Sequence, residues 1–140
     1  MSIHQKTFTL PPFPRGFHLI TQQIQNKISV INSSITGIAH IFIHHTSAGI
    51  TINENADPTV RMDFEKHFNV MVPENATYFK HTLEGSDDMP AHIKSSLLGH
   101  DLTIPISKGK LLLGIWQGIY LCEHRNDANS REFTITLLGV

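Results

Sequence analysis

The stretch LTIPISKGKLLLGIWQGIYLCEHRNDANSREFTITLL, residues 102–138, decides the fold class. It holds four runs rich in β-branched, aromatic and other apolar residues, with turn-forming residues such as Gly, Asn, Asp and Ser between them. We predict strands over residues 102–106, 110–116, 118–122 and 131–138. The connections are short enough for hairpins and too short for the crossover that parallel strands need. This part of the chain therefore indicates a largely antiparallel sheet.

Upstream of this stretch, strands and helices are intermixed without the alternation of βαβ units. Residues 3–10 alternate in character as a strand with one buried face does, and two more strands are predicted over residues 37–44 and 50–52. Such an order is typical of an α+β domain. We expect one compact domain over residues 1–140, a largely antiparallel sheet or sandwich with helices on one side.

Three segments carry the signals of helices. The first runs from Thr21 to about Ser34, the second from Asp57 to Pro73, and the third from the Asp87–Asp88 pair to Gly99. Apolar residues at helical spacing predict the buried face of each helix. These residues are Ile24, Ile28 and Ile31, then Val60, Phe64 and Phe68, and finally Ile93, Leu97 and Leu98.

The composition excludes several classes of protein. Its 140 residues match the usual size of one domain, and 40% hydrophobic with 16% charged residues excludes intrinsic disorder. No apolar run is long enough to span a bilayer, and the N-terminus does not resemble a signal peptide. The net charge of −1 provides no field that attracts nucleic acid. A single cysteine, Cys122, fits a reducing cytoplasm. We expect a cytoplasmic protein with neither a membrane nor a nucleic-acid partner.

Histidine is the unusual residue type, with 10 in the chain. It is both the commonest metal ligand and the commonest general acid–base group. Two histidines lie in HHTSAG, residues 44–49, directly after a predicted strand. Adjacent strand residues face opposite sides of a sheet, so only one of His44 and His45 can enter a given site. A partly buried histidine at a sheet edge explains this pair equally well.

A second cluster, HTLEGSDDMPAH, spans residues 81–92 at a helix start. One of Asp87 and Asp88 is expected to be the helix N-cap, and the other has no evident structural duty. His92 shares a helix face with serines three and four residues further on. Backbone N–H groups at this end of a helix favour anions. The face fits a polar cavity or plain solvent.

A third cluster, Glu123–His124–Arg125, follows the strand predicted over residues 118–122. Alternation puts Gln117 and Glu123 on one face of that strand and His124 on the other. The alternative is a solvated strand end with no chemical role.

All three clusters lie at the ends of predicted elements, where loops gather into sites. Three or four histidines with carboxylates would bind zinc or a similar divalent ion and leave one position for water. Without a metal, the same groups would act as acids and bases beside Arg125 and a helix N-terminus, which together suit phosphate. No HExxH, CxxC, Walker or nucleophile-elbow motif decides between the two.

Three longer segments make the chain similar to a known family. HHTSAGITINENADPTVRMDF (44–64), EGSDDMPAHIKSSLLGH (84–100) and SKGKLLLGIWQGIYLCEHR (107–125) closely resemble the YjbQ-like family. The resemblance implies a compact α+β fold, a homotrimer and a pocket of polar residues that takes a metal ion or an anion. Family members are described as uncharacterised or as secondary thiamine-phosphate synthases.

Matching positions supply the candidate site. The predicted metal ligands are His45, His92 and His124. The catalytic candidates are Asp87, Asp88 and Glu123, and the substrate-binding candidates are Asn53, Glu54, Gln117 and Arg125. His81 is a weaker candidate.

The leading functional hypothesis is an enzyme with weak thiamine-phosphate synthase-like activity. A divalent ion, Zn or Mg, and Arg125 would hold phosphate oxygens while Asp87 or Glu123 moves a proton. Loss of pyrophosphate needs concentrated positive charge, which the chain lacks, and a histidine-rich pocket suits a metal-dependent hydrolase better. The remaining alternative is a non-catalytic protein that binds a metal or a small phosphorylated or anionic ligand.

Overall fold

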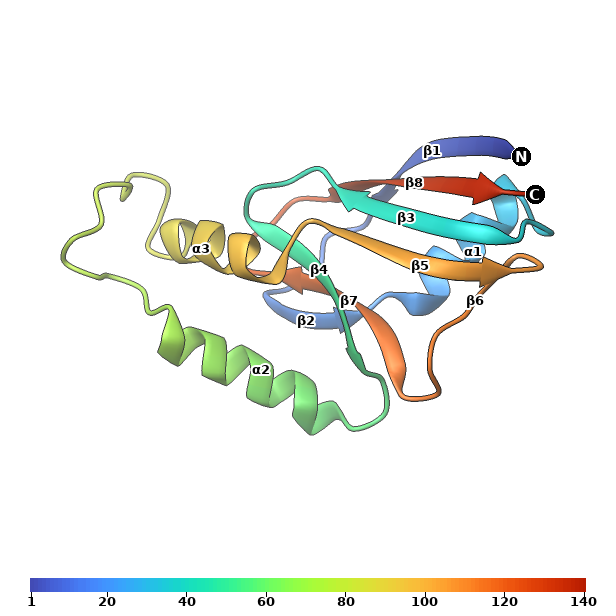
Figure 1. Ribbon diagram of the computed structural model, residues 1–140. Helices are drawn as coiled ribbons and strands as arrows, with labels where there is room; N and C mark the ends of the chain where they lie inside the picture. Colours follow the sequence, from blue (N-terminus) through green and yellow to red (C-terminus); the bar gives the residue numbers. More distant parts are fainter.

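The computed structural model describes all 140 residues, and its strands form two antiparallel sheets (Figure 1). The larger sheet has the order β1-β8-β3-β5-β6. Its strands are β1 (Ser2–Leu10), β3 (Gly37–Ile43), β5 (Asp101–Ser107), β6 (Lys110–Leu111) and β8 (Arg131–Gly139). The smaller sheet has the order β2-β7-β4, from β2 (Gly16–Leu19), β7 (Gln117–Glu123) and β4 (Ala48–Glu54). Every neighbouring pair is antiparallel, which confirms the expected α+β class and strand arrangement.

The main core lies between the two sheets. Ile41 and Ile135 of the larger sheet and Ile119 and Leu121 of the smaller one belong to the same buried cluster. Helix α1 (Thr21–Ile31) adds its buried face to this cluster. The apolar positions predicted for this helix are therefore confirmed, and its end lies three residues before the predicted one.

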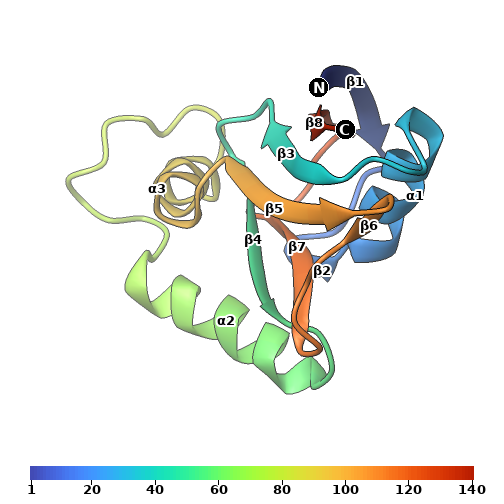
Figure 2. The same cartoon turned by 45° about the vertical axis from the view of Figure 1, so that its right-hand side comes forward.

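A second, smaller core covers the other face of β7. Tyr120 and Cys122 alternate with Ile119 and Leu121 along the strand, so they face away from the main core. Helix α2 (Pro58–Met71) brings phenylalanines to this face, and helix α3 (Asp88–Leu98) packs against β4. The helices thus lie on both faces of the smaller sheet (Figures 1 and 2). The prediction of helices on one side holds for α2 and α3, which lie on the outer face of the smaller sheet. It is wrong for α1, because the apolar face of α1 packs into the main core on the inner face of that sheet.

One further sequence prediction is wrong, and one strand was not predicted at all. The strand expected over residues 110–116 ends at Leu111, and the chain then leaves the sheet in a loop where Ile115 and Trp116 are 85% and 63% exposed. Strand β2 was not predicted, because four residues after a run of prolines are too few to display a period.

The buried face of α3 is also not the predicted one. Ala91, Lys94 and Ser95 are buried, whereas Leu97 is 59% exposed. The polar groups on the buried face have partners: Ser95 donates a hydrogen bond to the carbonyl of Ala48, and the Lys94 ammonium donates to the Asn69 side chain. Satisfied hydrogen bonds remove most of the cost of burying such groups, so periodicity of apolar residues does not identify this face.

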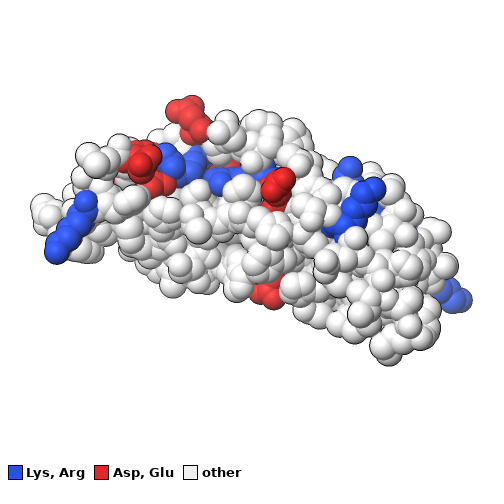
Figure 3. All heavy atoms as spheres, turned by 90° about the horizontal axis from the view of Figure 1, so that it is seen from above, with Lys and Arg blue, Asp and Glu red and all other residues white.

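On the face in Figure 3, charged side chains are few and scattered, several basic and acidic groups are adjacent, and no continuous basic patch forms. No helix is both long enough and apolar enough to cross a membrane.

Candidate functional site

The fold brings the three polar clusters to one end of the smaller sheet. Ala48, the first residue of β4, pairs with Glu123, the last residue of β7. Helix α3 packs on β4 and begins at the same end. The HHTSAG turn, the start of α3 and the segment after β7 are therefore neighbours in space, as the sequence predicts.

His81, Asp88 and His92 form the only group of three potential metal ligands whose ligand atoms all lie within 4.8 Å of one another. Oδ2 of Asp88 is 2.7 Å from Nε2 of His81 and 3.1 Å from Nε2 of His92. The Asp88 side chain is 6% exposed, while the two imidazoles are 47% and 31% exposed. The carboxylate is thus fixed inside the protein, and the histidines border solvent.

The ring of His92 is oriented by the backbone. Its Nδ1 lies 2.9 Å from the carbonyl oxygen of Thr46, which can only accept, so Nδ1 carries the proton. In the neutral imidazole, Nε2 is then unprotonated, and its lone pair points at the carboxylate oxygen of Asp88. Two acceptors that face each other at this distance need a cation between them, either a proton or a metal ion.

Arg125 holds both aspartates at the helix start. Its Nε donates to Asp87 at 2.8 Å, its Nη1 donates to Asp88 Oδ1 at 2.5 Å, and its Nη2 donates to the carbonyl of Glu84. All three guanidinium nitrogens are therefore engaged within the chain. This geometry points Oδ2 of Asp88 at the two histidines.

Asp87 occupies the N-cap position of α3 but does not cap the helix with its side chain. Its carboxylate instead accepts hydrogen bonds from Arg125 and from the backbone N–H of Asn126. The predicted N-cap position is thus confirmed, but the side chain binds the guanidinium and not the first turn of the helix, because a guanidinium is the stronger partner. Burial alone would raise the pKa of Asp87, but these hydrogen bonds outweigh it and hold the pKa below its usual value. Burial likewise raises the pKa of Asp88, and contacts with His81, His92 and Arg125 bring it below the usual range.

Glu123 is completely buried in an ion pair. Its two carboxylate oxygens accept from Nε and Nη2 of Arg131 at 2.7 and 2.5 Å. One of them also accepts the backbone N–H of Arg125. A carboxylate held in this way is well suited to position the segment after β7. Its predicted catalytic role stays a prediction.

His45 lies beside Arg131 and away from the metal-ligand group. Its Nε2 accepts a hydrogen bond of 2.7 Å from the backbone N–H of Glu132. Burial and the nearby Arg131 lower the pKa of His45, which favours the neutral ring. The neutral tautomer then carries its proton on Nδ1.

His124 is 1% exposed and belongs to the aromatic face of β7. Its ring is edge-on to Phe17, and its Nε2 is buried without a hydrogen-bond partner. Burial and the positive charges of Lys94 and Arg15 lower its pKa to about 3. Of the predicted ligands His45, His92 and His124, only His92 joins the group of three ligand atoms; the three-histidine set itself stays a prediction.

The buried imidazole of His124 should make stability depend on pH. Its pKa of about 3 lies below the ordinary 6.5, so between these pH values the His124 imidazole is protonated in the unfolded chain and neutral in the folded one. This stabilising contribution is complete above about pH 6.5 and is lost as the pH falls toward 3. We expect about 2 kcal/mol less unfolding free energy at about pH 5 than at about pH 7 from this group.

Urea unfolding of the wild type and of His124→Phe at these two pH values tests this expectation. The difference between the two proteins should change by that amount, whereas the exposed control His67→Gln should follow the wild type. If the difference in unfolding free energy between the wild type and His124→Phe does not vary with pH, the buried His124 ring does not have a lowered pKa.

Asn53, Glu54 and Gln117 lie at the other end of the β4–β7 pair. Glu54 pairs with Gln117, about six residues, or roughly 20 Å, from the pair of Ala48 with Glu123. Their side-chain oxygens accept hydrogen bonds from nearby backbone N–H groups. Within one chain, the structure does not bring these predicted substrate-binding residues to the aspartates; Arg125 alone of the four is there.

His81 is the residue that sequence reasoning undervalued. It belongs to the loop between α2 and α3, where no period indicates which side chains turn inward. Its place seven residues before Asp88, at the edge of the acidic helix start, was a weak signal, and the family resemblance had marked it only as a weaker candidate.

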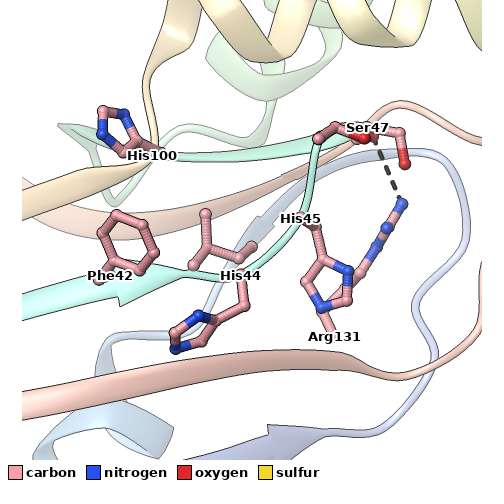
Figure 4. A pocket seen from close by; sticks show the side chains of 8 residues that line it. Phe42, His44, His45, Ser47, His100 and Arg131 are labelled. Carbon is pink, nitrogen blue, oxygen red and sulfur yellow. Dashed lines mark hydrogen bonds between the residues drawn. The ribbon is translucent and has the colours of Figure 1, made fainter.

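Two cavities border this end of the sheet and share His45, Ser47 and Arg131. One, of about 470 Å³, extends along the end of β3 to Phe42, His44 and His100 (Figure 4). The other, of about 410 Å³, extends to Arg125 and the loop before β8. Thr46 lines the first cavity and accepts a hydrogen bond from His92, and Arg125 lines the second and binds Asp88. The ligands themselves line neither cavity; His81 lines a smaller one of about 110 Å³.

Comparison with known proteins places the chain in a family. The family described as "UPF0047 protein YjbQ-like" matches residues 6–140. UPF0047 protein YjbQ of Salmonella typhimurium is 53% identical over 136 residues, which cover 97% of this chain and 98% of that protein. The Escherichia coli O157:H7 protein of the same name is 49% identical over the same share of each chain.

Solved structures agree with this result. A conserved hypothetical protein from Thermus thermophilus is 34% identical and has a TM-score of 0.84, covering 95% of this chain and 99% of that one. An uncharacterized YjbQ/UPF0047 protein from Clostridium acetobutylicum is 37% identical with a TM-score of 0.81, covering 93% and 97%. The chain shares the fold of these proteins along nearly its whole length, and it belongs to the YjbQ/UPF0047 family.

Proposed function

We propose that this protein is a metal-dependent hydrolase of small anionic substrates, whose metal ion is held by His81, Asp88 and His92. The observation that carries the proposal is the orientation of His92. Its Nδ1–H is bound to a backbone carbonyl, and its Nε2 faces a buried carboxylate oxygen. Histidines that bind metals are typically held in this way by their second ring nitrogen.

The donor set fits a divalent transition metal. Two imidazole nitrogens and one carboxylate oxygen are the ligands of many catalytic zinc sites, and a fourth position stays open. Ligand bonds of 2.0–2.1 Å in a tetrahedron place ligand atoms about 3.3 Å apart. The distances from Asp88 Oδ2, 2.7 and 3.1 Å, are within a small side-chain movement of that value. Imidazole ligands favour zinc over magnesium, which prefers oxygen.

The chain supplies the supporting groups as well. A divalent metal held there would polarise a substrate oxygen and lower the pKa of a coordinated water. Arg125 fixes Asp88 by its other oxygen, and Thr46 fixes His92. Such support around the ligands orients a metal site before any substrate arrives.

Thiamine-phosphate synthase-like activity receives less support from this geometry. A departing pyrophosphate needs several free cationic groups, and the charge of Arg125 is already paired with Asp87 and Asp88. That activity stays a prediction, as do the homotrimer and the cytoplasmic location. A binding protein without turnover would use the same ligands, so a measurement of turnover distinguishes it from a hydrolase.

Cobalt titration tests the metal site directly. Protein purified without a metal-affinity column should bind about one Co²⁺ per chain, with the visible absorption of a low-symmetry site, and Zn²⁺ should displace it. His92→Ala should lose this binding because one of three ligands is gone.

The matched control is His40→Ala. His40 lies 2.9 Å from Asp101 in an exposed histidine–aspartate pair that has no third ligand. This variant should bind Co²⁺ like the wild type. Equal binding by His92→Ala and the wild type would overturn the site, and a loaded protein that fails to hydrolyse a panel of phosphate and carboxylate esters would favour the binding protein.

A further inference from the structure

Arg131 has a hydrogen-bond donor that the fold leaves unused. Its Nε and Nη2 donate to Glu123, and Nη2 also reaches the carbonyl of Ser47. Its Nη1 has no partner within the chain. The side chain is 9% exposed and lines both cavities, so this remaining donor is directed into them from a rigid ion pair.

Two more donors lie next to this guanidinium. His45 accepts a backbone N–H with Nε2, which leaves Nδ1–H free on the neutral ring. The hydroxyl of Ser47 has no partner within the chain, although the residue is only 9% exposed. Figure 4 shows the ring of His45 beside the Arg131 side chain, with the guanidinium directed at Ser47.

Three carboxylates lie near these donors, but none accepts a hydrogen bond from Nη1 of Arg131, Nδ1 of His45 or the Ser47 hydroxyl, and Glu132, whose charge acts on His45, is exposed. Glu123 is on the inner side of Arg131 and has both oxygens occupied. Asp127 lines the second cavity as well, but it is exposed and belongs to the loop before β8. The charge of Arg131 is balanced by Glu123, so the feature that favours an anion is the set of three free N–H and O–H donors in a largely buried place.

From this arrangement we infer a subsite for a phosphate-type oxyanion, bound by Nη1 of Arg131, Nδ1–H of His45 and the hydroxyl of Ser47. Three donors from three residues suit the three terminal oxygens of a phosphate monoester better than the two oxygens of a carboxylate. The use of this subsite to hold a substrate rests on the proposed function, whereas binding of the anion does not.

The first cavity indicates where the rest of such a ligand lies. Phe42 is flanked by His44 and His100, whose ring centroids are 5.0 and 5.2 Å from its own. This wall offers aromatic surface to a planar or apolar group. The ligand class is thus a small phosphate monoester with a flat organic part.

Titration with inorganic phosphate tests the subsite. Calorimetry at constant ionic strength should detect binding to the wild type after treatment with EDTA, and to Asp88→Asn, since neither needs the metal. Ser47→Ala and His45→Phe should each weaken phosphate binding about tenfold or more, because each removes one hydrogen bond to a charged ligand. His67→Ala is the control, since His67 is exposed on α2 and lines neither cavity, and it should bind phosphate normally.

The outcomes separate this inference from the proposed function. No phosphate binding by the wild type, or normal binding by Ser47→Ala, overturns the subsite even if cobalt binds at His81, Asp88 and His92. If the wild-type protein binds phosphate but no cobalt, the subsite is supported and the metal site alone is overturned. Acetate that binds as tightly as phosphate overturns the assignment to a phosphate-type anion.

Discussion

Replacing Asp88 by asparagine should weaken metal binding by more than about 100-fold and abolish metal-dependent hydrolysis. Loss of a group that merely supports a ligand costs about 10–100-fold in metal affinity, and Asp88 is proposed to bind the metal itself. It is also the only anion in the His81–Asp88–His92 group. An asparagine keeps the size of the side chain and an acceptor for Arg125 but loses the charge.

Asp87→Asn provides a demanding control for this prediction. Asp87 precedes Asp88 directly, is similarly buried and binds the same guanidinium, but it does not belong to the ligand group. Its substitution should leave metal affinity within a few-fold of the wild type. Cobalt titration of both variants provides the measurement. If both lose affinity equally, the aspartates act only through the position of Arg125, and the ligand assignment is wrong.

Replacing Arg131 by methionine should lower the unfolding free energy by about 3–5 kcal/mol, because it leaves the charge of Glu123 buried without a partner. The Glu123 side chain is 0% exposed, and its oxygens accept three hydrogen bonds, two of them from Arg131. Few single substitutions in this chain should cost more.

The double variant Glu123→Leu/Arg131→Met identifies the cause of that loss. Removing both charges removes the unpaired group, so urea unfolding should recover most of the stability lost in the single variant. If Arg131→Met alone costs less than about 1 kcal/mol, the carboxylate of Glu123 is not a buried charge in solution. If the double variant is no more stable than the single one, packing of the Arg131 stem is the main contribution.

Local patterns in the sequence were sufficient for most of the strands, though not for β2 or the end of β6, and for the general place of the site. Alternation along residues 117–124 correctly separates Ile119 and Leu121 from Tyr120 and Cys122, because a strand has a strict period of two. Polar clusters at the ends of elements correctly predict that those ends meet, because short connections and antiparallel pairing leave few other arrangements. The buried face of α3 was not predictable in this way, since Lys94 and Ser95 are buried through hydrogen bonds to distant residues.

The partners within the site were decided by the tertiary structure. His45, His92 and His124 are the same residue type, but tertiary packing gives them different partners. The ring of His45 meets a backbone N–H, that of His92 a carboxylate and that of His124 an aromatic ring. His81 reaches Asp88 only because the loop between α2 and α3 returns to the start of α3. Sequence periodicity describes which way a side chain leaves its own helix or strand. The atoms that meet it are set by how separate elements pack, and that depends on contacts far apart in the chain.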